Sequence, residues 1–427
     1  MHTQPRRLSR INRPVVGTIA APGSKSDTHR ALLLAAHART PSQIDTASDC
    51  DDTDVLVAAL RKFGIAIVRS GNTLHVAPPA QLEAYEGEID CNLAGTSFRF
   101  LLPLCATVRD SQIQLTGSVR MCERPIGGLV DMLIDGGAQI TYDAHVGCPP
   151  ITIQGVTQLR GGDYELHDNC SSQYVSAMLL NATVFAGPIR VRFPEQIGSR
   201  SYIEMTIRSL QRFGYTVAAQ ASEVAIANPS RVDGQHYIVD GDASSATYFL
   251  ALAAVTGGCV RVTNLPKTSP QGDLRFASIL AEMGCRTERY YDAIEVDASE
   301  SGALRGIDVD LSDCPDTAPT LAVVAALADG QSVLRGLGSL VHKESDRMVA
   351  IAMELQRAGI DVKISADTLT IFGGTPRAAA ISPHGDHRIA MACALLSART
   401  GGIEITHPYV VSKSFRGFWD SWAQLIG

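Results

Sequence analysis

The sequence has no long uninterrupted apolar stretch and no recognisable targeting segment. A membrane-spanning helix needs roughly 18–20 uncharged apolar residues. The most apolar stretch, Ala246–Val260, is too short for this and contains threonine and two glycines. The basic start of the chain, Met1–Arg10, is followed by no apolar segment, so we expect no signal peptide. These absences predict a protein that does not act at a membrane.

The sequence also has no C-x-x-C pair. Its ten cysteines are scattered singly, in a spacing that resembles neither a zinc site nor a small disulfide framework. We therefore expect reduced thiols, mostly in the core, in a cytoplasmic protein. They are Cys50, Cys91, Cys105, Cys122, Cys148, Cys170, Cys259, Cys285, Cys314 and Cys393.

A surplus of basic residues is absent as well. The net charge of −7 argues against nucleic acid as the main partner, although a local basic cleft is compatible with it. The 427 residues are 45% apolar and 19% charged, which is typical of a globular protein with two or three domains.

Two kinds of segment are present six times each. The first places small polar or charged residues ahead of a run rich in alanine and leucine, which predicts an N-cap followed by a buried helix. Its copies are SKSDTHRALLLAA from Ser24, AGTSFRFLLPLCA from Ala94, CSSQYVSAMLLNA from Cys170, GDASSATYFLALAA from Gly241, PDTAPTLAVVAALA from Pro315 and GDHRIAMACALLSA from Gly385.

The second kind is a more amphipathic helix that ends in glycine, as a left-handed helix C-cap requires. The six glycines are Gly64, Gly137, Gly214, Gly284, Gly359 and Gly427. Strand-like runs follow or precede these helices. The chain is therefore predicted to be α/β, with six repeats of about 70 residues grouped in two lobes around parallel buried helices. The midpoint falls near residues 235–245.

The polar ends of the repeats carry the functional candidates, because backbone N–H groups and the helix dipole favour anions there. Ser26 and Arg30 share a helix face, and Gly95 allows a ligand to approach the backbone closely. Arg124, before a helix-opening proline, suits a clamp on carboxylate or phosphate. If the ends converge on one cleft, its ligands carry several negative charges. The cations are Lys25, Arg30, Arg124, Lys343, Arg347, Arg388 and Lys413.

Each motif, considered alone, could also have a purely structural role. Pro-Gly-Ser-Lys-Ser from Pro22 is not a Walker A loop, and alone it could be a solvated helix start. Ser171 and Ser172 could be ordinary helix caps, and Asp240 and Asp242 are interpreted as structural. Lys343 and Arg347 lie four apart, which is unfavourable on a helix unless an anion bridges them.

The ordered set of motifs closely resembles the 5-enolpyruvylshikimate-3-phosphate synthase family across essentially the whole chain. The resemblance implies a two-lobed inside-out α/β barrel of six repeats. It places one lobe at 23–239 and the other at 1–22 joined to 240–427. The motifs are Pro-Gly-Ser-Lys-Ser with Arg30, Ala-Gly-Thr from Ala94, Glu-Arg-Pro-Ile-Gly from Glu123, Ser-Ser-Gln from Ser171, Gly-Asp-Ala-Ser-Ser from Gly241, Lys-Glu-Ser-Asp-Arg from Lys343, Asp-His-Arg from Asp386, and Lys413.

The same resemblance implies two substrate sites. The phosphoenolpyruvate site comprises Lys25, Gly95, Arg124, Gln173, Arg347, Arg388 and Lys413. The shikimate 3-phosphate site comprises Lys25, Ser26, Arg30, Ser171, Ser172, Gln173, Ser199, Asp316, Ser339 and Lys343. In it, the three serines Ser171, Ser172 and Ser199 hold the phosphate and Arg30 holds the carboxylate.

The activity implied is 3-phosphoshikimate 1-carboxyvinyl transfer, a step toward chorismate and the aromatic amino acids. By hypothesis Asp316 accepts the proton of the attacking 5-hydroxyl, assisted by Lys343, and Glu344 protonates the methylene carbon of phosphoenolpyruvate. Lys25 and the arginines stabilise the charge of the tetrahedral intermediate. Lobe closure would exclude water. No metal or other cofactor is needed, and we expect a cytoplasmic monomer with small-molecule partners only.

Two positions depart from the family pattern. Leu93 stands where an asparagine often precedes Ala-Gly-Thr, and Ser339 stands near an asparagine that commonly contacts shikimate 3-phosphate. Gly95 is kept, and glycine there usually accompanies sensitivity to glyphosate, so we predict an enzyme that glyphosate inhibits.

Three alternatives can be distinguished from this assignment. The sister family that uses UDP-N-acetylglucosamine has Lys-Asn instead of Lys25-Ser26, and a reactive cysteine where this chain has Val119; Cys122 is misplaced for that role. A non-catalytic anion-binding relative would lack some of Asp316, Lys343 and Glu344, and all three are present. A transferase with another cyclic acceptor is supported only by the two departures.

Overall fold

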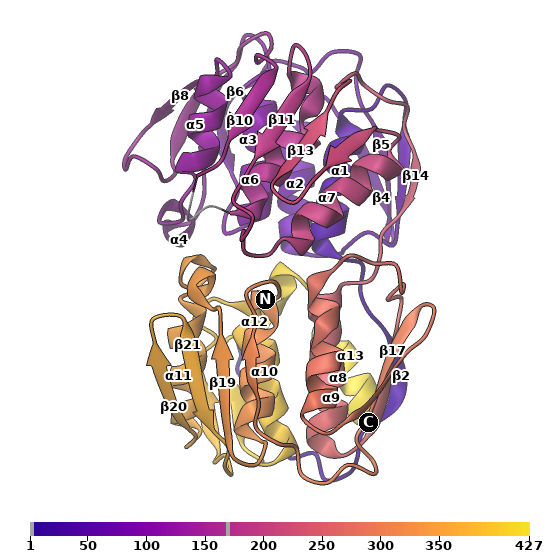
Figure 1. Ribbon diagram of the computed structural model, residues 1–427, viewed down its shortest axis with the longest axis vertical. Helices are drawn as coiled ribbons and strands as arrows, with labels where there is room; N and C mark the ends of the chain where they lie inside the picture. The colour runs from indigo at the N-terminus through magenta and orange to yellow at the C-terminus, as the bar shows by residue number, and fades with distance from the viewer. Residues whose placement is uncertain (1–3, 168–170) are drawn as a thin grey trace. The chain divides into compact units, whose positions relative to one another are not determined.

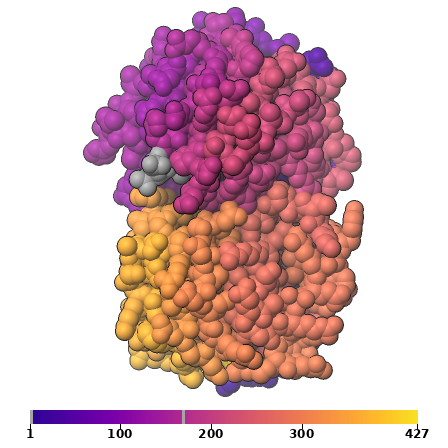
Figure 2. Space-filling model, in the orientation of Figure 1, coloured from indigo at the N-terminus to yellow at the C-terminus, as the bar shows by residue number. Residues whose placement is uncertain are grey.

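The computed structural model describes residues 4–167 and 171–427. The chain divides into two compact units (Figure 1, Figure 2). We call Gly23–Val239 the N-terminal unit, and Met1–Pro22 with Asp240–Gly427 the C-terminal unit. In the described part of the chain, no helix has the length and apolar character needed to cross a membrane.

The N-terminal unit alternates helices with short strands (Figure 1). Its described elements are α1 (Lys25–Ala36), β3 (Ser42–Asp45), α2 (Asp51–Arg61), β4 (Ala66–Ser70), β5 (Thr73–Ala77), β6 (Glu86–Asp90), α3 (Gly95–Cys105), β7 (Gln112–Thr116), α4 (Val119–Cys122), α5 (Gly127–Asp135), β8 (Gln139–Tyr142), β9 (Ile151–Gln154), β10 (Gly162–Glu165), α6 (Ser172–Leu180), the 3-10 helix η1 (Ala182–Val184), β11 (Ile189–Arg192), α7 (Ser201–Arg212), β12 (Val217–Ala219), β13 (Glu223–Ile226) and β14 (His236–Ile238).

The C-terminal unit follows the same alternation. Its described elements are β1 (Arg6–Leu8), β2 (Val16–Ala20), α8 (Ala243–Thr256), β15 (Cys259–Thr263), η2 (Gly272–Arg275), α9 (Phe276–Glu282), β16 (Arg286–Arg289), β17 (Ala293–Asp297), β18 (Asp308–Asp310), η3 (Pro315–Thr317), α10 (Ala318–Ala326), β19 (Gln331–Arg335), η4 (Gly338–His342), α11 (Arg347–Arg357), β20 (Asp361–Ser365), β21 (Thr368–Phe372), β22 (Ala379–Ile381), α12 (His387–Ala394), η5 (Leu395–Ala398), β23 (Ile403–Ile405), η6 (Pro408–Lys413) and α13 (Phe418–Ile426).

The sheets repeat one topology. In the orders β6-β7-β9-β8, β10-β11-β13-β12 and β18-β19-β21-β20, the first pair is parallel and the next two pairs are antiparallel. Two further sheets complete this pattern with a strand from elsewhere in the chain. β14 joins β3 in parallel, and β2 joins β15 in parallel. A three-stranded sheet, β1-β23-β22, is the sixth, so the predicted α/β fold with six repeats is confirmed.

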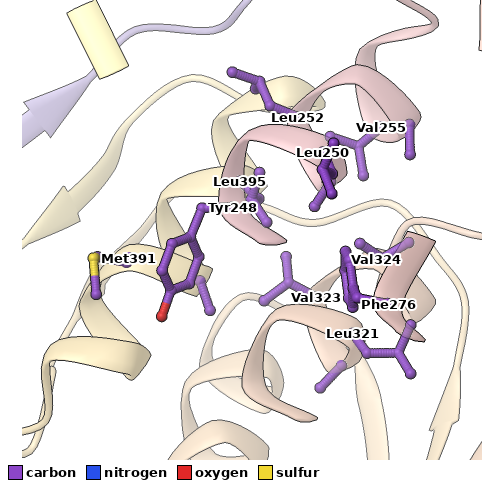
Figure 3. Packing of buried hydrophobic residues seen from close by; sticks show 14 of the residues in the cluster. Tyr248, Leu250, Leu252, Val255, Phe276, Leu321, Val323, Val324, Met391 and Leu395 are labelled. Carbon is purple, nitrogen blue, oxygen red and sulfur yellow. The ribbon is translucent and has the colours of Figure 1, made fainter. Parts of the chain in front are cut away.

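Buried helices form the core of each unit, as their apolar composition predicts. In the C-terminal unit these are α8, α10 and α12, and every residue of α8 from Ala243 to Val255 is buried. Figure 3 shows how Leu250 of α8, Val323 of α10 and Leu395, the first residue of η5, lie in one apolar cluster. A helix that is buried on all sides can present only its ends to a ligand, so its N-terminus becomes the functional surface.

The glycines that were predicted to cap the second helix of each repeat adopt left-handed backbone angles, with φ between +80° and +114° at all six. In four repeats the residue after the glycine donates its N–H to the carbonyl five residues earlier, which is the Schellman pattern. These bonds are Ala138 to Leu133, Tyr215 to Leu210, Cys285 to Leu280 and Ile360 to Leu355.

Substitution of a capping glycine tests this backbone requirement. A Cβ at Gly214 would meet no atom within 4 Å, so Gly214→Ala introduces only the strain of its φ of +96°. We expect a loss of about 1–2 kcal/mol in the free energy of unfolding, measured by urea denaturation. Gly187→Ala is the matched control, because Gly187 also has open space but no positive φ. Equal stability of the two variants would contradict the capping role.

The nine cysteines in the described residues are free thiols, and six of them are buried. Burial raises the pKa of the Cys105 and Cys314 thiols to about 12, so they are protonated apolar groups at neutral pH. Cys170, for which the sequence also predicts a reduced thiol, lies outside the described residues.

Candidate active site

The predicted site residues lie at the N-terminal ends of the buried helices or in the segments just before the second helices. Lys25 and Ser26 open α1, Gly95 opens α3, and Asp316 lies in η3 ahead of α10. Capping side chains hold these ends in place: Ser24 accepts from Asp27 N, Ser171 from Gln173 N, and Asp386 from Arg388 N.

Asp316 is the centre of an ion-pair network in the C-terminal unit. Its Oδ1 accepts a 2.8 Å bond from Arg347 Nη1 and lies 3.2 Å from Lys343 Nζ. Its Oδ2 accepts a 3.0 Å bond from Arg388 Nη2. Three segments far apart in sequence, the starts of α10, α11 and α12, therefore meet at one carboxylate.

Arg347 links this carboxylate to two others. Its Nη2 lies 2.5 Å from Glu344 Oε2, and its Nε lies 2.7 Å from Asp386 Oδ2. Lys413 Nζ, at the end of η6, lies 3.3 Å from Glu344 Oε1. The Arg347 side chain is only 2% exposed, so a buried guanidinium serves Asp316, Glu344 and Asp386 at once.

The network sets the charge of its members. Burial opposes ionisation of Asp316, but Arg388, Lys343 and Arg347 outweigh it and hold the pKa of this carboxyl well below its usual range. Burial likewise disfavours a charged Arg347, yet Asp386, Glu344 and Asp316 raise its pKa above the ordinary value. Asp316 is therefore an ionised carboxylate at neutral pH, surrounded by cations.

The anion that bridges Lys343 and Arg347 is a carboxylate of the chain itself. The prediction that these two residues form a like-charge pair at helical spacing is wrong in its geometry. η4 ends at His342, Lys343 has an extended backbone, and α11 begins only at Arg347. Both cations instead contact Asp316, which removes their mutual repulsion. Ser339, predicted to contact substrate, is an exposed residue of η4.

In the N-terminal unit Lys25 is paired with Asp52 at the start of α2. Lys25 Nζ lies 2.9 Å from Asp52 Oδ2, and both side chains are largely buried. The Asp52 carbonyl accepts a 3.1 Å bond from Ser97 Oγ, which ties this pair to α3. Lys25 is therefore held by a fixed carboxylate partner.

Arg30 is buried, at 1% exposed, and protein groups take up most of its guanidinium. Its Nε donates to Thr206 Oγ1, its Nη1 to the Ser26 carbonyl, and its Nη2 to the Tyr202 carbonyl and to Ser176 Oγ. The 2.7 Å bond from Arg30 Nη1 reaches the backbone carbonyl of Ser26, so the prediction that both side chains address one ligand stays a prediction. Burial lowers the pKa of Arg30 to about 10, so it is still a cation at neutral pH.

Two buried arginines flank Gly95. Arg99 Nη1 donates to the Gly95 carbonyl at 3.0 Å, and its Nη2 donates to the Pro125 carbonyl at 2.8 Å. A Cβ built on Gly95 would overlap Arg124 Nη1 and would lie 2.7 Å from Arg124 Cζ. Glycine is therefore required for Arg124 to lie against this backbone. Pro125 precedes α5 but does not open it, because the helix begins at Gly127.

The predicted phosphate-binding serines occupy two different local structures. Ser171 caps α6, and Ser172 is its first residue and is buried. Ser199 has a positive φ of 58° and lies two residues before α7. Gln173 Nε2 donates to Thr96 Oγ1 at 3.4 Å, while its Oε1 is buried without a hydrogen-bond partner among the described residues. Leu93 packs against the apolar core of the N-terminal unit.

Sequence reasoning missed several partners of the site residues. Asp52 holds Lys25, and Arg99 holds the Gly95 backbone. Asp386 belongs to a predicted motif, but its contact with Arg347 was not predicted. Only Arg99 had a local signal, since it is a charge four residues after Gly95 inside an otherwise apolar helix. In the part of the chain that the structure describes, no group of three or more His, Cys, Asp or Glu side chains could hold a metal ion.

Comparison with known proteins finds relatives that match nearly the whole chain. The family model described as EPSP synthase (3-phosphoshikimate 1-carboxyvinyltransferase) matches residues 9–422. A 3-phosphoshikimate 1-carboxyvinyltransferase of Methanosphaerula palustris is 40% identical over 415 residues, covering 96% of this chain and 97% of the relative. One of Trichormus variabilis is 35% identical over 421 residues, with 98% of each chain covered.

Solved structures agree with the sequence comparison. An EPSP synthase from Acinetobacter baumannii superposes with a TM-score of 0.81 at 26% identity, covering 99% of this chain and 98% of that one. The enolpyruvyl transferase NikO from Streptomyces tendae has a TM-score of 0.74 at 17% identity, covering 99% of this chain and 97% of that one, and shows the shared fold alone.

Proposed function

Because the chain belongs to the EPSP synthase family, we propose that it transfers the enolpyruvyl group of phosphoenolpyruvate to the 5-hydroxyl of shikimate 3-phosphate. The products are 5-enolpyruvylshikimate 3-phosphate and inorganic phosphate. The observation that carries the proposal is the network around Asp316, in which one ionised carboxylate contacts Lys343, Arg347 and Arg388. Such a site offers both a proton acceptor and a set of cations to a pair of anionic substrates.

We propose that Asp316 accepts the proton of the 5-hydroxyl while its oxygen attacks C2 of phosphoenolpyruvate. Glu344 gives its proton to C3, and the tetrahedral intermediate then returns a C3 proton to the Glu344 carboxylate and expels phosphate, which gives the enol ether. The low pKa of Asp316 makes it a weak base in the arrangement described above. An anionic substrate that draws Arg347 and Arg388 toward itself would raise that pKa, so binding would activate the base.

The remaining roles follow the same charge logic. Lys25, Arg124, Arg347, Arg388 and Lys413 are proposed to bind phosphoenolpyruvate, together with Gly95 and Gln173. We propose that shikimate 3-phosphate contacts a second set of residues, which shares Lys25 and Gln173 with the first. Its phosphate would lie against Ser171, Ser172 and Ser199. Support comes from Gln173 Oε1, which is buried without a hydrogen-bond partner among the described residues, and from the N-terminus of α6, which carries Ser171 and Ser172. This second set is Lys25, Ser26, Arg30, Ser171, Ser172, Gln173, Ser199, Asp316, Ser339 and Lys343.

The assignment is tested by phosphate release from phosphoenolpyruvate, with shikimate 3-phosphate or UDP-N-acetylglucosamine as the acceptor. We expect release only with shikimate 3-phosphate. Val119, which is 82% exposed, stands where the sister family carries a reactive cysteine, so no covalent thiol chemistry is available at that position. No phosphate release with either acceptor would overturn the proposed function. Release with UDP-N-acetylglucosamine would show that the chain has the activity of the sister family instead.

Gly95→Ala is expected to weaken phosphoenolpyruvate binding without unfolding the protein. The new methyl group overlaps the far ends of Arg124 and Arg99, which are flexible side chains and can move away. We expect the KM for phosphoenolpyruvate to rise by about tenfold or more, equivalent to one lost charge-assisted contact. Gly127→Ala is the control, because its Cβ meets nothing closer than 3.5 Å. An unchanged KM would remove Arg124 from the substrate site.

Glyphosate inhibition and assembly are further parts of the proposal. We expect inhibition by glyphosate that competes with phosphoenolpyruvate; near-normal turnover in a large excess of glyphosate would contradict this. We also propose that the enzyme acts as a cytoplasmic monomer. Light scattering of the purified chain should then give a mass close to 45.5 kDa.

A further inference from the structure

A fully buried carboxylate, Glu354 of α11, holds the segment 382–386 that leads into α12, which we call the lead segment. Glu354 is 0% exposed, and its Oε2 accepts a 3.0 Å hydrogen bond from Ser382 N. His384 Nε2 lies 2.8 Å from Glu354 Oε1, and because a carboxylate oxygen accepts, the imidazole donates. Arg357 Nε supplies a third bond of 3.1 Å from α11 itself. A buried carboxylate is costly unless it is paired, so these contacts are a fixed part of the fold.

The lead segment has an unfavourable backbone conformation. His384 has a φ of 53° and Gly385 a φ of 70°, so two successive residues are left-handed. A residue with a Cβ rarely adopts this conformation, which persists where surrounding contacts impose it. The bond between the His384 imidazole and Glu354 is such a contact. Without this bond, we expect the lead segment to relax toward other backbone conformations.

The lead segment in turn fixes two cations of the candidate active site. Asp386 N donates to the Pro383 carbonyl at 2.8 Å, which closes a turn within the segment. Asp386 Oδ1 then accepts from Arg388 N at 2.9 Å, and its Oδ2 accepts from Arg347 Nε at 2.7 Å. Both arginines also donate to Asp316. A shift of this turn would therefore move the cations around Asp316.

Helix α11 contacts the lead segment at both of its ends. Arg347, the first residue of α11, pairs with Asp386 at the C-terminal end of the segment. Glu354, seven residues later, bonds Ser382 and His384 toward the N-terminal end. Seven residues make two helical turns, so the two side chains lie on one face of α11, roughly 10 Å apart along its axis. The lead segment is therefore fastened along that face.

We propose that Glu354 and His384 are positioning residues of the transfer reaction. They hold the lead segment, and through Asp386 they set the positions of Arg347 and Arg388. This inference rests on the proposed function, because it needs these two arginines to bind phosphoenolpyruvate. Loss of the Glu354–His384 bond should then weaken the binding of phosphoenolpyruvate more than that of shikimate 3-phosphate.

The first test compares His384→Ala with His384→Gln. Alanine removes the donor to Glu354, whereas the glutamine amide places an N–H group close to the position of imidazole Nε2. We expect the KM for phosphoenolpyruvate to rise by about tenfold in His384→Ala, equivalent to one lost charge-assisted hydrogen bond, and to return close to the wild-type value in His384→Gln. The KM for shikimate 3-phosphate should change much less. An unchanged KM for phosphoenolpyruvate in His384→Ala, or an equal rise in both KM values, would overturn the proposal.

Arg357→Gln is the matched control. Arg357 also bonds Glu354, but its side chain is 50% exposed and it belongs to α11, not to the lead segment. The variant removes one ion pair of Glu354 without releasing the lead segment, so we expect both KM values to stay within about twofold of the wild type. A rise as large as that of His384→Ala would show that the charge balance of Glu354 controls binding, which would contradict the proposal.

Amide hydrogen exchange tests the anchoring without any substrate. Glu354→Met keeps an unbranched side chain of similar length but removes both acceptor oxygens. We expect the hydrogen-bonded amides of Ser382, Asp386 and Arg388 to exchange about tenfold faster, while the amides of the β18-β19-β21-β20 sheet keep their rates. If Glu354→Met does not fold, His384→Ala is measured instead, with the same expectation. Exchange at the wild-type rate would contradict the anchoring of the lead segment.

Kinetics and hydrogen exchange can fail independently of each other. A wild type that releases no phosphate with shikimate 3-phosphate, together with the expected exchange in Glu354→Met, would refute only the proposed activity and would retain the anchored lead segment. An active wild type whose variants show unchanged exchange and an unchanged KM for phosphoenolpyruvate would refute the positioning role of Glu354 and His384.

Discussion

Asp316→Asn should lower kcat by about 10²–10⁴-fold while changing the KM of either substrate much less. The carboxylate is already ionised and contacts three cations, so it can accept a proton as soon as an anionic substrate competes for those cations. Asparagine has nearly the same shape but cannot accept the proton. The measurement is steady-state phosphate release with both substrates varied.

The kinetic constants of Asp316→Asn distinguish a catalytic base from a residue that only holds Arg347 and Arg388 in place. If Asp316 only orders these arginines, the asparagine variant should raise the KM for phosphoenolpyruvate and largely retain kcat. Asp308→Asn serves as the control, because Asp308 forms an exposed pair with Arg335 in the same unit. A control that loses as much activity as Asp316→Asn would remove the case for a specific base.

The fold could be predicted from the sequence because its signals are local and repeated. A polar cap before a buried helix and a glycine after an amphipathic helix each depend on a few neighbouring residues. Both signals recur six times, so one ambiguous copy matters little. The assignment of a strand to a particular sheet has no such local signal. That β14 completes the sheet of β3, and β2 the sheet of β15, depends on contacts across about 200 residues, and no local pattern specifies them.

The site was predictable only for residues that belong to a recognisable motif. Asp316 and Arg347 were found this way, but their geometry was not, because the helical spacing assumed for Lys343 does not exist. Asp52 lies in a segment with no motif of its own, and it pairs with Lys25, which reaches it from the start of another helix. Electrostatic partners are set by tertiary structure, so sequence periodicity carries no information about them.

Arg347→Met should produce the largest loss of stability in the C-terminal unit, roughly 3–5 kcal/mol in the free energy of unfolding. The guanidinium is buried and contacts Asp316, Glu344 and Asp386, of which Asp386 is fully buried. Methionine fills part of the volume but leaves these carboxylates without their shared cation. Removing one partner of a buried ion pair costs more than the pair itself contributes, because the remaining charges stay desolvated.

The measurement is urea denaturation at neutral pH, followed by a probe of the C-terminal unit such as the fluorescence of Trp419 and Trp422. Arg335→Met is the matched control, since Arg335 makes a well-formed but exposed pair with Asp308, and we expect little change there. Arg347→Lys should fall between the two, because it keeps the charge and loses the fork that reaches three carboxylates. If Arg347→Met lowers the free energy of unfolding no more than the control does, the three ion pairs of Arg347 do not stabilise the unit as proposed.

The pH dependence of the stability difference between the wild type and Arg347→Met tests the role of the Arg347 ion pairs independently. A carboxyl whose pKa is depressed in the folded state stabilises the protein above its unfolded pKa, and this stability is lost as pH falls through the folded value. Asp316 is such a group, and Arg347 is one of the cations that depress its pKa. The difference in unfolding free energy between the wild type and Arg347→Met should therefore shrink as pH falls below about 4, where the unfolded carboxyls become protonated. A difference that stays constant down to pH 3 would mean that Arg347 stabilises the unit by packing, and not by its three ion pairs.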